Sequence, residues 1–149
     1  MFFRERLSFA GRQKQLKGFL MLKKRGLLSY IFLSLITVGI YGLWRIYVLA
    51  RDLNTMCEGD GKKTAGLIKL ILLGLITLGI YDIVWIYKLA DRIQANGPKY
   101  NVVIKDSSGT ILLWIILGSL IGIGPIVAWY KIFKNTNILI EEYNKKIPA

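Results

Sequence analysis

Three long apolar runs constrain this chain more than any other feature of its sequence. The runs cover residues 27–50, 67–90 and 111–133, and polar connectors separate them. A 24-residue helix is about 36 Å long, against about 30 Å for the hydrocarbon core of a bilayer. Hydrophobic residues make up 54% of the chain, and its mean hydropathy is +0.44. We therefore predict an all-α membrane protein with three transmembrane helices rather than a water-soluble globule.

The rest of the chain is polar and mostly basic, with a net charge of +12. Residues 1–25 are predicted to be a basic amphipathic segment, either a helix lying on an anionic leaflet or a frayed tail that orients the spans. Residues 26–144 form a single membrane domain, whose end overlaps a short polar helix or tail at 134–149. Charge of this kind beside apolar runs favours anionic lipid as the partner over nucleic acid.

The apolar runs are repeats of one another. Residues 26–50 and 66–90 share 14 identities in 25 aligned positions at an offset of 40 residues, and a degenerate third copy follows at an offset of 43. Each copy contains a glycine break and ends in aromatic and basic residues. Internal repetition of this kind is common in membrane proteins.

The sequence T-x-G-I-Y lies inside each of the first two copies, and Trp85 follows the second of them by four residues. In these residues the chain resembles a bacterial family of small integral-membrane domains of unknown function, which carries a doubled T-x-G-I-Y-x-x-x-W. Trp44 lies one place earlier than that pattern, and Asp82 replaces a residue that is usually small. Asp52-Leu53-Asn54 and Asn137 look like polar positions of the family. The resemblance covers about residues 26–144 and implies a membrane location without an established activity.

Small and hydroxyl residues near the middle of the runs are candidate breaks in the helices. Glycine exposes the backbone, and threonine can bond to the carbonyl one turn back, so both loosen a helix. They can serve as hinges at bilayer depth, or as close contacts between helices, for which Gly118-x-x-x-Gly122 has the usual spacing. The candidate hinge residues are Thr37, Gly39, Thr77, Gly79, Gly122, Gly124 and Pro125.

Aromatic and basic residues gather near the carboxyl ends of the runs. We interpret them as an interfacial belt with lysine and arginine side chains that reach lipid headgroups, rather than as a ligand cage. The predicted belt consists of Trp44, Arg45, Tyr47, Trp85, Tyr87, Lys88, Trp129, Tyr130 and Lys131.

Asp82 lies within the second apolar run, where a carboxylate is energetically costly and therefore a candidate functional residue. An ion pair with Arg45 is the simplest explanation. Such a pair requires both runs to dip into the bilayer from one face and fold back at the glycine break, because two antiparallel spans place the two residues on opposite sides of the midplane. We favour three spans with the N-terminus in the cytoplasm over such re-entrant hairpins, which leave backbone groups unsatisfied unless other protein covers them.

The chain contains no histidine and only one cysteine, Cys57, which excludes the usual catalytic triads and makes a zinc site improbable. Asp52, Glu58 and Asp60 suggest a solvated loop more than a metal cluster. We therefore expect no enzyme activity, no cofactor and no metal.

The leading functional hypothesis is a scaffold or accessory subunit of the bacterial plasma membrane. It would form homo-oligomers or bind another membrane protein, and it would hold anionic lipid. Two alternatives remain: an oligomeric channel or transporter component that uses Asp82, and a membrane-shaping protein built from hairpins.

Overall fold

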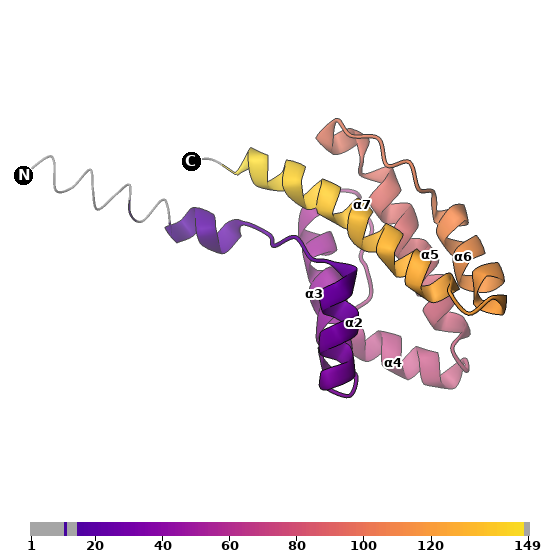
Figure 1. Ribbon diagram of the computed structural model, residues 1–149. Coiled ribbons are helices and arrows are strands. Elements are labelled where there is room, and N and C mark those ends of the chain that lie inside the picture. Colours follow the sequence, from indigo (N-terminus) through magenta and orange to yellow (C-terminus); the bar gives the residue numbers. More distant parts are fainter. Residues whose placement is uncertain (1–10, 12–14, 148–149) are drawn as a thin grey trace, which may run out of the picture.

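The computed structural model describes residue 11 and residues 15–147, and these residues contain helices and no strand (Figure 1). A short helical segment covers residues 15–20, which belong to the predicted amphipathic segment; residues 1–10 and 12–14 of that segment lie outside the described part. The prediction of an all-helical chain is confirmed. The elements are α2 (Leu27–Ile36), α3 (Ile40–Met56), α4 (Leu67–Ile76), α5 (Ile80–Ala95), the 3-10 helix η1 (Pro98–Tyr100), α6 (Ser108–Leu120) and α7 (Gly124–Lys146).

The sequence favoured three spans, with kinked or re-entrant runs as the alternative, and in the structure none of the three runs forms one continuous helix. Each apolar run is divided near its middle, so that it forms a leading helix (α2, α4 or α6), a tight turn and a trailing helix (α3, α5 or α7). The turns contain glycines with positive φ, Gly39 at 89°, Gly79 at 87° and Gly122 at 78°, a conformation that cannot continue a right-handed helix. Among the described residues, no helix combines the length and the hydropathy needed to cross a membrane.

The three hairpins pack in a ring. Each leading helix contacts its own trailing helix and the trailing helix of the preceding hairpin: α2 contacts α3 and α7, α4 contacts α5 and α3, and α6 contacts α7 and α5. The leading helix of the first hairpin thus packs on the trailing helix of the third, in the same way as the other leading helices pack on the hairpin before them. This last contact closes the ring. Figure 1 shows that the three turns lie toward the lower right, away from both ends of the chain.

The core lies at the end of the ring opposite the turns. The largest fully buried side chains include Leu53 and Met56 on α3, Leu89 on α5 and Leu139 on α7, all in the half of the trailing helix far from its turn. By contrast, α2 contains no buried residue, and the buried residues of α4 are Leu70 and Gly74. The turn ends of the hairpins therefore project from the body that the trailing helices form. We call the projecting ends the tips and the opposite end the base.

Two asparagines fix the segments that lead into the first two hairpins. Asn137 on α7 accepts a hydrogen bond from the Arg25 backbone N–H at 2.9 Å and donates one to the Arg25 carbonyl at 2.7 Å. Asn54 on α3 makes the same pair of bonds with Thr64, at 2.8 and 3.1 Å. Asn54 and Asn137 occupy equivalent places in the first and third repeats. Each therefore connects its own hairpin to the next one around the ring.

Arg92 is the centre of a buried polar network at the base. Its guanidinium donates to both carboxylate oxygens of Asp60, at 2.7 and 2.9 Å, and also to Asn54, Thr64 and two backbone carbonyls. These bonds hold the pKa of Asp60 well below its usual range, chiefly through the hydrogen bond from Arg92. The network joins the 57–66 connector to α5.

We predict that Arg92→Leu destabilises the fold by about 3 kcal/mol, because it leaves Asp60 and several buried acceptors unpaired. The pKa of Asp60 is lower in the folded protein, so the network stabilises the fold above the unfolded value of about 4 and loses that effect as the pH falls toward the folded value. Urea unfolding in detergent at several pH values measures both effects. The control is Lys134→Leu, a substitution at an exposed position, which should change the free energy of unfolding by no more than about 0.5 kcal/mol. An equal loss in both variants would contradict the central role of Arg92.

Candidate functional site

The turn of the first hairpin is held together by one threonine. The Thr37 hydroxyl donates to the Leu33 carbonyl at 2.7 Å and accepts the Tyr41 backbone N–H at 2.9 Å, so it bonds to the last turn of α2 and the first turn of α3. The Gly39 N–H bonds to the Ser34 carbonyl at 2.7 Å. Every backbone N–H from residue 37 to residue 41 has an acceptor within this turn. The turn therefore satisfies these donors without water.

The second turn repeats this arrangement. The Thr77 hydroxyl donates to the Leu73 carbonyl at 2.6 Å and accepts the Tyr81 N–H at 2.9 Å, and the Gly79 N–H bonds to the Gly74 carbonyl at 2.8 Å. The T-x-G-I-Y motif is thus a turn motif. Its threonine supplies the bonds on both sides, and its glycine supplies the positive φ.

The third turn uses different residues for the same purpose. Ser119 donates from its hydroxyl to the Ile115 carbonyl, and the Gly122 N–H bonds to the Ser119 carbonyl at 3.0 Å. Pro125 lies in the first turn of α7, where a residue without an N–H leaves no donor unsatisfied. Of the predicted packing pair, Gly118 is buried on α6, whereas Gly122 lies in the turn itself.

Small residues allow the two helices of each hairpin to approach closely beside the turn. A Cβ added to Gly118 would lie 2.7 Å from the Gly124 Cα, and one added to Gly42 would lie 3.1 Å from the Ser34 hydroxyl. In the second hairpin, a Cβ on Gly74 would lie 2.7 Å from a carboxylate oxygen of Asp82. The close contacts of the glycines are thus within hairpins.

The residue between threonine and glycine is strained and exposed. Val38 has a φ of 50° and Leu78 a φ of 51°, the left-handed region in which a side chain with a Cβ costs roughly 1–2 kcal/mol. Val38 is 92% exposed and Leu78 is 94% exposed, higher values than for any other large hydrophobic residue described. A strained backbone at such a position is typical of functional sites.

Other apolar residues surround these two on all three tips. They are exposed by between 47% and 84%, and together they make the tips the largest gathering of exposed aliphatic side chains in the described chain. Exposed apolar patches of this extent mark interaction sites with membranes or other proteins. The tip residues are Leu35, Ile36, Val38 and Ile40 in the first hairpin, Leu75, Ile76, Leu78 and Ile80 in the second, and Ile116, Leu117, Leu120, Ile121 and Ile123 in the third.

The predicted ion pair between Asp82 and Arg45 is absent from the described contacts. Arg45 is buried, lies 5.0 Å from the ring centre of Phe133, and donates one long bond of 3.5 Å to the Gly26 carbonyl. Asp82 lies on the first turn of α5 and faces the second hairpin's own leading helix. The two side chains therefore belong to different hairpins and have different neighbours.

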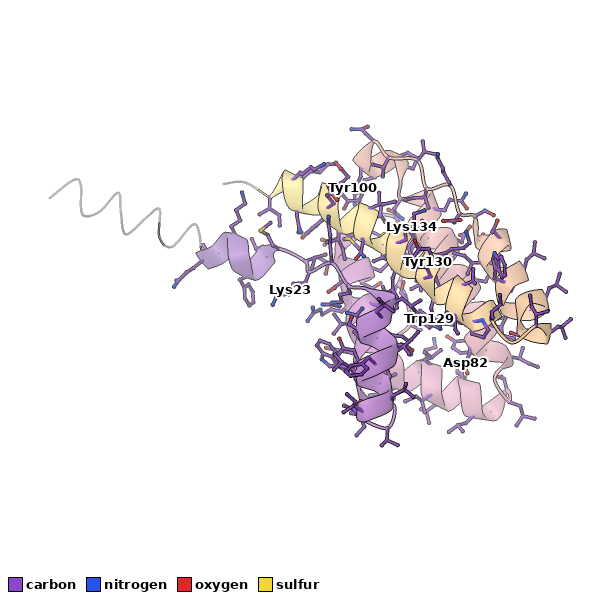
Figure 2. The ribbon with its side chains drawn as sticks, viewed as in Figure 1. Lys23, Asp82, Tyr100, Trp129, Tyr130 and Lys134 are labelled. Carbon is purple, nitrogen blue, oxygen red and sulfur yellow. The ribbon has the colours of Figure 1, made fainter. Side chains whose placement is uncertain are left out.

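The predicted belt residues have diverse environments. Trp44, Tyr47, Tyr87 and Tyr130 are exposed, as is Lys88. The other members have partners within the protein: Trp85 is buried and donates to the Ala65 carbonyl at 2.9 Å, Trp129 packs on Tyr30 and Phe133, and Lys131 forms an ion pair with Asp106. Figure 2 shows Trp129 and Tyr130 on α7.

Of the three carboxylates that suggested a solvated loop, Asp52 on α3 and Asp60 in the connector are bound by arginines, and Glu58 is exposed. Asp52 is buried and pairs with Arg25 at 3.3 Å and with Arg51 at 2.9 Å, while Asp60 pairs with Arg92. The repeat aligns Asn54 with Asn137, a signal that could have indicated their shared backbone-clamping role. The partnership of Arg92 with Asp60 has no comparable signal, because nothing in the spacing of residues 60 and 92 relates them.

These features define the class of protein: a ring of three helical hairpins, each closed by a polar turn with an apolar tip. A family model described as Domain of unknown function (DUF4234) matches the chain twice, at residues 25–95 and 66–139. The chain belongs to this family. Each match spans two consecutive hairpins, so the internal repeat predicted from the sequence is also present in the comparison. No curated protein and no solved structure matches the chain.

We predict that the free energy of unfolding is about 1 kcal/mol higher for the Leu78→Asn variant than for the Leu75→Asn variant. The reason is that asparagine tolerates the left-handed conformation of position 78. Both substitutions remove an exposed leucine from the same tip; asparagine at position 75, in the last turn of α4, also costs roughly 0.5 kcal/mol of helix propensity, and the rest of the difference measures the backbone strain. Chemical denaturation in the same detergent measures it. Equal free energies would show that position 78 is unstrained.

We predict that Cys57 resists alkylation in the folded protein. Its side chain is buried, and burial raises its pKa to about 11 from an ordinary value near 9, which lowers the thiolate fraction at pH 8 about 100-fold. A maleimide should label Cys57 readily in denaturant and at least about 100-fold more slowly without it. Equal rates would contradict the burial; Glu58→Cys, at the exposed neighbouring position, provides the control for reagent access.

Proposed function

We propose that this chain is a non-enzymatic, monotopic protein of the bacterial plasma membrane that inserts its three hairpin tips into one leaflet. The observation that carries the proposal is the pair of turns at Val38 and Leu78, where nearly fully exposed apolar residues lie on backbone whose N–H groups are all bonded internally. In water this arrangement leaves a large apolar surface exposed. In hydrocarbon, lipid covers the exposed side chains, and the backbone N–H groups of residues 37–41 and 77–81 already have acceptors within the turns.

The lengths of the leading helices fit one leaflet. Helices α2 and α4 contain ten residues each, and so are about 15 Å long, half of the roughly 30 Å hydrocarbon core. Such hairpins leave the base, with its buried polar network, outside the hydrocarbon. They also keep the connectors 57–66 and 96–107 on the same side, so the basic residues of both can face the anionic cytoplasmic surface.

The chemistry of the chain favours a scaffold or accessory subunit over an enzyme. There is no histidine, and the single cysteine is buried with a raised pKa, so the commonest general base is missing and the thiol nucleophile is unreactive. Exposed apolar residues continue along the outer faces of the leading helices, including Leu28, Phe32, Ile68 and Leu113. We propose that these faces contact lipid and a second copy or another membrane protein, while the basic N-terminal segment holds anionic lipid.

A charge at a tip tests the insertion. The protein is synthesised without detergent in the presence of vesicles of phosphatidylethanolamine and phosphatidylglycerol, and the vesicles are floated. We expect Leu78→Glu to lower the ratio of bound to free protein roughly tenfold or more, since a carboxylate in hydrocarbon is costly. The matched control is Val103→Glu, a base residue that is 83% exposed. Equal binding of the two variants would overturn the insertion of the tips.

Sided labelling distinguishes hairpins from spans. Glu58→Cys and Lys105→Cys place exposed thiols in the two connectors, in a Cys57→Ala background. An impermeant maleimide applied to intact spheroplasts should spare both thiols and label both after lysis. Labelling of position 58 but not 105 in intact cells would show that the second run crosses the membrane, and would overturn the monotopic arrangement.

A further inference from the structure

A cavity of about 610 Å³ lies between the first two hairpins and the start of α7. Its walls are mainly aliphatic side chains from α3, α4 and α5, such as Leu43, Leu70 and Leu75. Aromatic rings contribute from three helices: Tyr30 on α2, Trp85 on α5 and Trp129 on α7. Asp82 is the single ionisable acid or base, apart from tyrosine, among the described residues that line it. The volume is within the range of small-molecule pockets.

The carboxylate of Asp82 is not explained by the fold. Among the described contacts it accepts no hydrogen bond and forms no ion pair, although it is half-buried against apolar walls. The first hairpin provides an internal comparison, since the positions equivalent to Gly74 and Asp82 are Ser34 and Gly42 there. That hairpin closes with the same turn and no carboxylate. The second hairpin therefore does not need an acid at position 82 to fold.

The lining matches the chemistry of an apolar cation. A half-buried carboxylate against apolar walls attracts a single positive charge, and the faces of tryptophan and tyrosine rings attract cations that are weakly hydrated. The aliphatic remainder of the wall accommodates hydrocarbon substituents, whereas a hydrated metal ion would need several oxygen ligands that this cavity lacks. Figure 2 shows Asp82 on α5 and Trp129 on α7, and both residues line the cavity.

We propose that the Asp82 cavity binds a monovalent organic cation with bulky apolar substituents, such as a quaternary ammonium or phosphonium. Asp82 neutralises the charge of the ligand, and the rings of Trp85 and Trp129 contact its cationic centre or its substituents. Leu75 and Leu78 of the tip also line the cavity, so a ligand dissolved in hydrocarbon can reach it. The site adds ligand binding to the proposed scaffold, and binding in detergent does not depend on how the tips meet the membrane.

Tetraphenylphosphonium titrated into the full chain in dodecyl maltoside tests the site. We expect saturable binding of one cation per chain, with a change in tryptophan fluorescence. Asp82→Asn should weaken the binding roughly tenfold or more, because it removes the only formal negative charge of the cavity. The control is Asp91→Asn on the same helix, whose carboxylate pairs with Lys62 near the base, and this variant should bind as the wild type does.

Two further measurements distinguish binding at Asp82 from hydrophobic partitioning of the cation. The double variant Gly74→Ser, Asp82→Gly copies the pair that closes the first hairpin, so it should fold and lack the binding. Triphenylphosphine oxide, a neutral analogue, should not compete at concentrations that saturate the cation. Undiminished binding by Asp82→Asn and by the double variant, or equal competition by the neutral analogue, would overturn the proposal and indicate hydrophobic partitioning.

Discussion

The hydroxyl of one threonine, bonded to the helix before it and to the helix after it, determines what each of the first two apolar runs becomes. Without such a bridge, a run of 24 apolar residues is long enough for one spanning helix. With Thr37 or Thr77 in place, and a glycine two residues later in the left-handed conformation, the run reverses within three residues. Two helices result, joined by a turn whose polar groups bond internally and whose exposed side chains are apolar, and the packing of the whole chain follows from their presence.

In the closed ring, the leading and trailing helices contribute differently to the buried core. The trailing helices α3, α5 and α7 carry most of the buried side chains and the polar network of Arg92, whereas α2 contributes no buried residue and α4 contributes Leu70 and Gly74. Stability therefore resides at the base, and the tips are free to carry strained and exposed residues such as Leu78. This separation is consistent with a protein whose body remains in water while its tips enter an apolar phase.

Much of this architecture could be predicted from local patterns. The repeat, the helical class and the role of the threonine and glycine as breaks follow from residues that are close in sequence. Spans were preferred over hairpins because run length and hydropathy do not register a single turn whose bonds are supplied by one side chain. The partners of Arg92 and the environment of Arg45 depend on the ring, which brings residues from different hairpins together. The position of Asp82 over Gly74 could be predicted only once the hairpin was known.

The contacts between neighbouring hairpins do not depend on which hairpins are joined directly in the sequence. Asn137 binds the segment before α2 just as Asn54 binds the segment before α4, although the former link joins the two ends of the described chain and the latter joins adjacent repeats. Spatial order is thus independent of chain order. A circular permutant opened beside the exposed Val103, in the connector between α5 and α6, with the present ends joined, would retain the same set of interfaces between hairpins.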